Sequence, residues 1–113
     1  MLIRHNTKNH WSFTDMPGTA VYTSRDIIEQ RKPILLVMHD QDDGAWQFFA
    51  GPGVPDADAR IAALDEIINC DPSVIELADL PLGWIAIRRS IATSWQRHPI
   101  PLNVSNEFQH SAA

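Results

Sequence analysis

Apolar positions along the chain change their spacing several times, and each spacing predicts a different element. A continuous apolar run at 34–38 precedes a turn rich in Asp and Gly at 40–44, and aromatic residues alternate at 46–49. Two strand-length segments joined by turn residues are typical of a β-hairpin, so we expect one here. Further short strands are predicted at 19–23 and at 83–89.

Apolar residues at helical spacing predict helices between these strands. Four of them share one helical face: Ile61, Leu64, Ile67 and Ile68. We expect this helix to be capped by Asp56 or Asp58 and to end near Asn69. Shorter helices are expected over 25–31 and 71–80. This order favours an α+β fold, a mostly antiparallel sheet with two or three helices packed on one face.

The length of 113 residues fits a single folded domain. The first 18 residues are polar apart from Trp11 and Phe13, whose spacing suits a short strand with both rings on one face. The last 16 residues contain prolines and a polar end. We therefore expect a polar N-terminal arm at 1–18, one α+β domain at 19–97, and an extended C-terminal tail at 98–113.

Composition restricts the partners that the protein is expected to bind. Nine Lys and Arg against 14 Asp and Glu give a formal net charge of -5, which disfavours non-specific binding to nucleic acid. No run approaches the roughly 20 apolar residues of a membrane helix, so no membrane partner is expected. The single cysteine, Cys70, cannot form an internal disulfide, which favours a cytoplasmic location.

Charge is unevenly distributed along the chain. Residues 33–79 hold ten acidic residues and one basic residue, whereas the flanks together hold eight basic and four acidic residues. Such a distribution predicts a bipolar surface that attracts a basic partner. The residues that we expect to contact it are Asp40, Asp42, Asp43, Asp56, Asp58, Trp46, Trp84 and Arg88.

No motif in the sequence indicates a catalytic or metal-binding site. The acidic residues after His39 are typical of a hairpin turn and lack the spacing of a calcium loop. The five histidines also lack the spacing of a zinc site. We expect no catalytic residue, metal or cofactor. An enzyme that uses His39 with an aspartate or with Cys70 is the least favoured interpretation.

Several short motifs occur in an order that resembles one small bacterial family. They are Arg31-Lys32-Pro33-Ile34, Asp43-Gly44-Ala45-Trp46-Gln47-Phe48-Phe49-Ala50-Gly51, Ala63-Leu64-Asp65-Glu66-Ile67-Ile68, Asp71-Pro72-Ser73-Val74, and Pro81-Leu82-Gly83-Trp84 with Arg88. This order resembles that of the immunity protein thirty-three-like group, whose biochemistry is unknown and which is classed with immunity proteins of polymorphic toxin systems. The resemblance covers about residues 20–97. Here Ala45 separates the turn glycine from the tryptophan, which are adjacent in the family pattern.

The resemblance implies a non-enzymatic protein that neutralises a partner by occlusion, and it implies no catalytic residue. Such a partner would offer a basic surface, for example the substrate cleft of a nuclease toxin. We expect reversal of Asp42 and Asp43 to Lys to slow association and to weaken its salt dependence. The alternative is a small-ligand-binding or regulatory domain with a pocket between sheet and helices, lined by Trp46 and Trp84. Ligand-induced changes in tryptophan fluorescence or melting temperature would reveal it.

Overall fold

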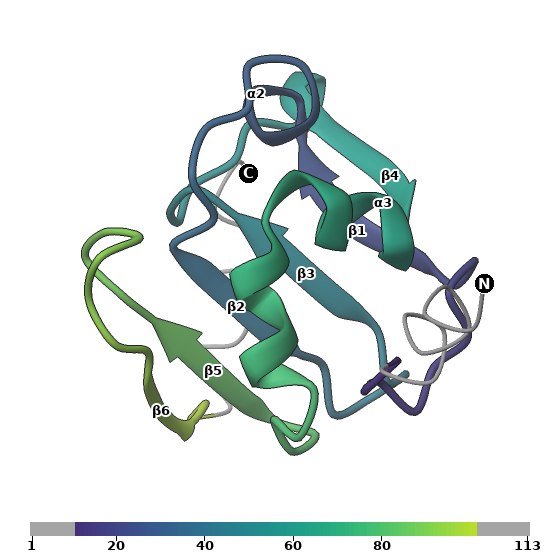
Figure 1. The fold of residues 1–113 in the computed structure, drawn as a ribbon, viewed down its shortest axis with the longest axis vertical. Helices are drawn as coiled ribbons and strands as arrows, with labels where there is room; N and C mark the ends of the chain where they lie inside the picture. The colour runs from purple at the N-terminus through teal and green to yellow at the C-terminus, as the bar shows by residue number, and fades with distance from the viewer. Residues whose placement is uncertain (1–10, 102–113) are drawn as a thin grey trace, which may run out of the picture.

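The computed structural model describes residues 11–101 of the chain (Figure 1). Its elements, in order, are β1 (Ala20–Ser24), α2 (Arg25–Ile28), β2 (Leu36–His39), β3 (Trp46–Phe49), the 3-10 helix η1 (Asp56–Asp58), β4 (Ala59–Ala63), α3 (Leu64–Cys70), the 3-10 helix η2 (Pro72–Leu77), β5 (Trp84–Ile87) and β6 (Gln96–Pro99). The predicted hairpin is confirmed as β2 and β3, and the strands predicted at 19–23 and 83–89 correspond to β1 and β5.

The described strands form one six-stranded sheet in the order β4-β1-β3-β2-β5-β6. The β2–β3 hairpin folds back so that β3 lies beside β1, and these two strands run parallel, with Tyr22 opposite Gln47. Every other neighbouring pair in this sheet is antiparallel. The predicted α+β class with a mostly antiparallel sheet is therefore confirmed.

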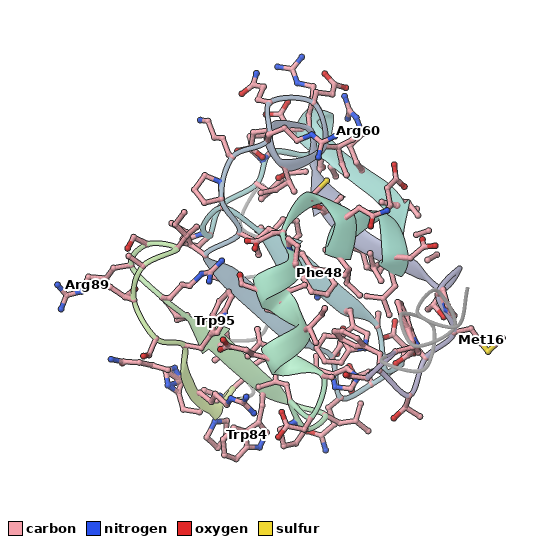
Figure 2. All side chains as sticks on the ribbon, in the orientation of Figure 1. Met16, Phe48, Arg60, Trp84, Arg89 and Trp95 are labelled. Atoms are coloured by element: carbon pink, nitrogen blue, oxygen red, sulfur yellow. The ribbon has the colours of Figure 1, made fainter. Side chains whose placement is uncertain are left out.

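Helices α3 and η2 lie across one face of the sheet, and the main core is formed between them and the strands (Figure 1). Alternate strand residues point into this layer, because successive side chains of a strand face opposite ways. Phe48, which is fully buried, lies between the sheet and these helices (Figure 2). The apolar residues of the helices face inward at three-residue intervals: Leu64 and Ile67 on α3, Val74 and Leu77 on η2.

The opposite face of the sheet, which we call the open face, carries a second apolar cluster. Its buried members are Leu36, Met38, Phe49 and Ile85, and half-buried Val54, Ile87 and Ile100 pack against them. The continuous apolar run that precedes the hairpin turn therefore serves both faces of a central strand.

Residues 59–63 form strand β4, so the helix predicted from the caps at Asp56 or Asp58 is wrong in its first part. The strand pairs with β1 over its whole length, from Ala59 opposite Ser24 to Ala63 opposite Ala20. Ile61 consequently lies exposed on the open face, away from the helical layer. Residues 59–63 contain only one large apolar residue, Ile61, so their apolar pattern does not decide between strand and helix, and the available pairing partner does.

The other predicted helices are shorter than expected. The segment predicted over 25–31 is helical only at 25–28, and the third helix is a 3-10 helix, η2. Its predicted start is confirmed, because the Asp71 carboxylate accepts a hydrogen bond from the Ser73 N–H at 3.1 Å. Proline at the first helical position also fits this start.

The expected boundaries of the arm and the tail do not match the packing. Phe13 is buried in the main core, and Trp11 packs against that core. Their ring centroids lie 5.9 Å apart, although 11–13 is not a strand. At the other end, His98 and Pro99 belong to β6. The remainder of the predicted arm and tail, residues 1–10 and 102–113, lies outside the described residues.

Candidate functional site

The strand directions bring four chain segments together at one end of the sheet. Strands β2, β4 and β6 end where β1, β3 and β5 begin. We call this the acidic end and define it by residues 11–19, 40–45, 64–66 and 78–83. These segments precede β1, connect β2 to β3, begin α3, and precede β5.

Acidic side chains gather in these four segments, which contain no lysine or arginine. They are Asp15, Asp40, Asp42, Asp43, Asp65, Glu66 and Asp79. All except Asp15 and Asp40 are exposed residues. Carboxylates of one sign at a common surface sum to a negative potential that reaches beyond any single contact. This end of the sheet can therefore attract a basic surface.

The β2–β3 turn holds its carboxylates in defined orientations. The Asp42 N–H donates to Asp40 Oδ1 at 3.2 Å, and the Ala45 N–H donates to Asp43 Oδ1 at 2.9 Å. Gly44, at a φ of +73°, provides the left-handed conformation that the turn requires. These hydrogen bonds limit the motion of the turn, so less conformational entropy is lost when a partner binds to it.

Asp79 is paired with a basic residue from the neighbouring edge strand. Arg97 Nη1 on β6 lies 2.8 Å from Asp79 Oδ1, and Arg97 Nη2 donates to the Glu76 carbonyl at 2.7 Å. The hydrogen bond from Arg97 and its positive charge lower the pKa of Asp79 below its ordinary value of 3.8. This carboxylate therefore stays ionised at physiological pH.

Two large apolar side chains are exposed among these carboxylates. Leu82 is 53% exposed and Met16 is 74% exposed. A Cβ atom placed on Gly44 would lie 4.0 Å from Leu82 Cδ2, so Leu82 lies directly beside the acidic turn. Apolar side chains inside a polar rim are typical of protein-binding surfaces. The acidic end thus offers both charge and apolar contact area.

Basic side chains gather at the opposite end of the sheet. They are Arg25, Arg31, Lys32, Arg60, Arg88 and Arg89. In Figure 2, Arg60 lies near the top and Arg89 at the left, whereas Met16 lies at the right and Trp84 at the bottom. Five acidic residues nearly balance this end: Asp26, Glu29, Asp56, Asp58 and Asp71. Asp58 pairs with Arg25 at 3.6 Å, and Glu29 pairs with Arg60 at 3.9 Å.

The five aspartates expected on one surface are divided between the two ends. Asp40, Asp42 and Asp43 lie at the acidic end, whereas Asp56 and Asp58 lie in η1, beyond the far end of β3. Strand β3 separates the two groups. The predicted acidic surface is therefore corrected in two ways. The aspartates of η1 do not belong to it, and the hairpin aspartates are joined by Asp15, Asp65, Glu66 and Asp79.

Trp46 belongs to the core and is not available to a partner. It is 1% exposed, its ring stacks on His39 at 3.8 Å, and its Nε1 donates to Asp15 Oδ1 at 3.1 Å. It fills the space between sheet and helices in which a ligand pocket was expected. Trp84 is half-buried and packs against the same core. The tryptophan pair therefore does not enclose the predicted pocket.

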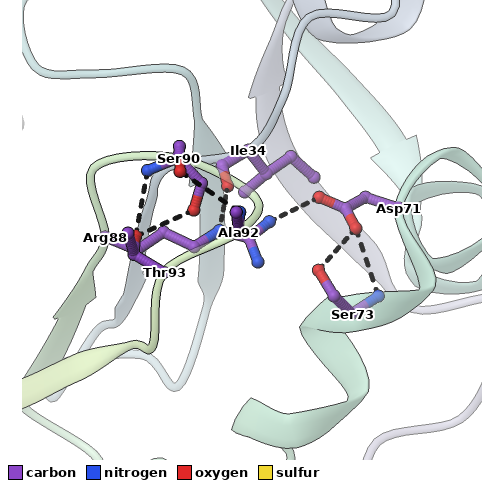
Figure 3. A network of polar contacts seen from close by, with 7 residues as sticks. All are labelled: Ile34, Asp71, Ser73, Arg88, Ser90, Ala92 and Thr93. Carbon is purple, nitrogen blue, oxygen red and sulfur yellow. Dashed lines mark hydrogen bonds and ion pairs between the residues drawn. The ribbon is translucent and has the colours of Figure 1, made fainter.

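Arg88 is likewise a structural residue rather than a surface contact (Figure 3). It is 5% exposed, and its Nη2 lies 2.8 Å from Asp71 Oδ2. Its Nε donates to the Ile34 carbonyl at 3.0 Å, and its guanidinium carbon lies 4.1 Å from the centre of the Trp95 ring. Arg88 thereby connects β5 to the segment before β2 and to the start of η2.

His39 and Cys70 do not converge on one site. His39 ends β2 at the acidic end, where its Nδ1 lies 2.7 Å from the Leu80 carbonyl. Cys70 ends α3 at the opposite end, where Arg31 Nη1 lies 3.5 Å from its sulfur. Over residues 11–101, no three His, Cys, Asp or Glu side chains are grouped in a way that would hold a metal ion.

Sequence patterns alone did not identify four of the seven carboxylates at the acidic end. Asp15, Asp65, Glu66 and Asp79 lie far from the hairpin turn in sequence. The usable signal is strand direction: once the pairing order is known, every loop at one end of the sheet is identified.

Comparison of the chain with protein-family models, with curated proteins and with solved structures found no match in any of the three. Within the part of the chain that the structure describes, no helix has the length and apolar character needed to cross a membrane.

Proposed function

We propose that this protein is a non-enzymatic binding protein that covers a basic surface of a partner protein with its acidic end. The observation that carries the proposal is the gathering of seven carboxylates, without lysine or arginine, in four segments at one end of the sheet. Complementary charge accelerates association and disfavours partners of the wrong charge.

The exposed apolar residues at this end support a protein partner in particular. The negative charge would also attract a free cation, but a bound cation would leave Leu82 and Met16 exposed to water. A protein surface that covers them removes their apolar area from water, and this burial stabilises the complex by roughly 25 cal/mol per Å². The rigid turn beside Leu82 limits the entropic cost of that contact.

The immunity role rests on the resemblance of motif order rather than on geometry. We propose it as the specific form of the binding function, in which occlusion of a basic toxin cleft neutralises the toxin. A cytoplasmic location belongs to the same proposal, since a single cysteine and no internal disulfide suit a reducing compartment.

The test compares charge reversals of equal size at the two ends of the sheet. In the first variant, Asp42→Lys and Asp65→Lys change the acidic end. In the matched control, Glu29→Lys and Asp56→Lys change the opposite end. Each pair moves the formal net charge from -5 to -1, because each substitution adds two positive charges. Asp43 is left intact because its carboxylate holds the turn.

Tagged protein of each form is used to capture partners from a lysate of the source cells at low and high salt. We expect the native chain and the control to retain the same stoichiometric, basic partner, with less retained at high salt. The acidic-end variant is expected to lose it, mainly through slower association. Equal retention by both variants would contradict the proposed interface, and a partner that is insensitive to salt would contradict the role of charge.

A further inference from the structure

A small hollow lies on the open face of the sheet, at a distance from the acidic end. Its volume is about 140 Å³, and its floor is formed by neighbouring strands β1, β2 and β3. The segment 51–54, which follows β3, forms one wall. The hollow is separate from the helical layer, in which Trp46 fills the available space.

The hollow has a mixed lining, with polar and apolar side chains. Leu36, Met38, Phe49 and Val54 line it, and all four belong to the second apolar cluster. Aromatic and thioether side chains provide a polarisable surface that suits a flat ring. A volume of about 150 Å³ is enough to hold a benzene-sized ring in an apolar protein cavity, so a molecule of that size fits here.

One of the polar side chains that line this hollow, that of Gln47, has no hydrogen-bond partner within the described part of the chain. Gln47 is 8% exposed and lines the hollow, and its amide makes no hydrogen bond to any other residue in 11–101. Among the described residues, Trp95 Nε1 is the one side-chain N or O atom that is both fully enclosed and without a hydrogen-bond partner, so the Gln47 amide atoms are not fully enclosed. The Gln47 amide therefore still reaches the open space of the hollow.

A mostly buried amide without a protein partner is costly, because it keeps only those hydrogen bonds to water that the hollow admits. A side chain such as Met or Leu would fill the same space between Phe49 and Tyr22 without that cost. A ligand that pairs with the amide would recover the lost hydrogen bonds. The amide has one acceptor and two donor positions, and it pairs best with a group that offers both a donor and an acceptor side by side.

We propose that this hollow binds a small, uncharged ring that carries a carboxamide, with the ring against Met38 and Phe49 and the carboxamide paired to Gln47. Two parallel hydrogen bonds then join the two amides. Asp56 also lines the hollow, so an anionic analogue with a carboxylate in place of the carboxamide is disfavoured. This site is independent of the proposed partner surface, and neither depends on the other.

The test uses benzamide as the probe, with toluene and benzoate as matched analogues that lack the amide or carry a charge. Each is titrated into the isotope-labelled full chain while the side-chain amide signals of Gln47 are followed by nuclear magnetic resonance. We expect benzamide to shift these signals and to bind roughly tenfold more tightly than toluene, the gain expected from two net hydrogen bonds. Benzoate is expected to bind more weakly than benzamide.

Gln47→Met keeps the length of the side chain and removes the amide. Because the amide is unpartnered in the free protein, this variant is expected to fold with an unchanged or higher Tm. Its affinity for benzamide should fall to that for toluene. Gln96→Met is the control, since Gln96 is exposed on β6 and does not line the hollow. This control should keep the preference for benzamide.

Two results would overturn the proposal. The first is that the Gln47 amide signals of the native chain do not move as benzamide is raised to its solubility limit. The second is that Gln47→Met retains the native preference for benzamide over toluene. Failure of the charge-reversal test at the acidic end would leave both readouts unaffected, so the two proposals can fail separately.

Discussion

Arg88 illustrates how the surroundings of a single residue change its role. Next to Arg89 and near tryptophans in sequence, it is typical of a binding residue. In the fold it is almost completely buried, where Asp71, the Ile34 carbonyl and the Trp95 ring surround its guanidinium. The planar guanidinium makes these contacts in different directions at once, which an ammonium group cannot do.

We expect Arg88→Met to lower the free energy of unfolding by about 3 kcal/mol, because it leaves a half-buried carboxylate without its charged partner. The cost lies at the lower end of such effects because Asp71 keeps its hydrogen bonds to Ser73. Urea unfolding, read from the midpoint at unchanged m-value, measures this loss. Arg97→Met is the control, and its pair with the exposed Asp79 should contribute far less. Equal losses in the two variants would refute a special role for Arg88.

Asp79 gives a prediction about pH. Its pKa is lower in the folded chain than the ordinary value of 3.8, so the folded state favours the ionised form. The resulting stabilisation is present above pH 3.8 and is lost as the pH falls through the lowered pKa. Arg97→Met removes the cause, so the pKa of Asp79 should return towards 3.8. A titration of the Asp79 carboxyl carbon by nuclear magnetic resonance checks this, and an unchanged pKa in the variant would show that Arg97 is not the cause.

At the scale of elements, β4 and α3 share one apolar pattern but form different structures. Ile61 and Leu64 continue the same three-residue spacing, yet the chain changes from strand to helix between Ala63 and Leu64. The β1 edge is free to pair with residues 59–63, and this pairing satisfies backbone groups over five residues. Helix α3 then begins where the Glu66 carboxylate accepts a hydrogen bond from the Ala63 N–H at 3.3 Å.

The start of β5 depends on a glycine. Gly83 has a φ of +79°, its N–H donates to the His39 carbonyl, and its own carbonyl accepts from the Ile100 N–H. A Cβ at this position would lie 2.7 Å from Gln41 Oε1, so the Gln41 side chain must move. We expect Gly83→Ala to lower the free energy of unfolding by about 1–2 kcal/mol, mainly because alanine disfavours a left-handed backbone.

Gly18→Ala provides the matched control for that prediction. A Cβ at Gly18 meets no atom within 4 Å, and Gly18 is not among the described residues of positive φ. Its free energy of unfolding should change by less than about 0.5 kcal/mol. Thermal and urea unfolding of the two variants provide the comparison, and similar effects would contradict the argument from backbone conformation.

At the scale of the whole molecule, charge polarity arises from topology. The sequence has an acidic middle, and this predicts one acidic surface. In the structure, the acidic loop residues within 11–101 lie at one end of the sheet or the other, depending on which strands their loops connect. Asp15, from before β1, joins the hairpin aspartates, whereas Asp56 and Asp58 leave them. One end of the sheet is acidic, whereas the other end carries nearly as many acidic as basic residues, so the charge difference between the two ends comes mainly from the acidic end.

Local patterns in this chain determine what depends on near neighbours. Turn residues predict the hairpin turn, and the capping residue Asp71 predicts the start of η2. Helical periodicity predicts the inward residues of α3 and η2. All three signals act within a few residues. These elements also suffice to predict the α+β class, because alternating and helical spacings bury their apolar sides in different ways.

Tertiary structure decided what depends on residues distant in sequence. Pairing with β1 made a strand of residues 59–63, and burial against Trp95 and Asp71 made Arg88 structural. Strand direction assembled the acidic end, and the pairing of β3 between β1 and β2 placed Gln47 in the hollow on the open face. None of these outcomes has a local signal, because each depends on which segments meet once the sheet closes, and that is set by packing of the whole chain.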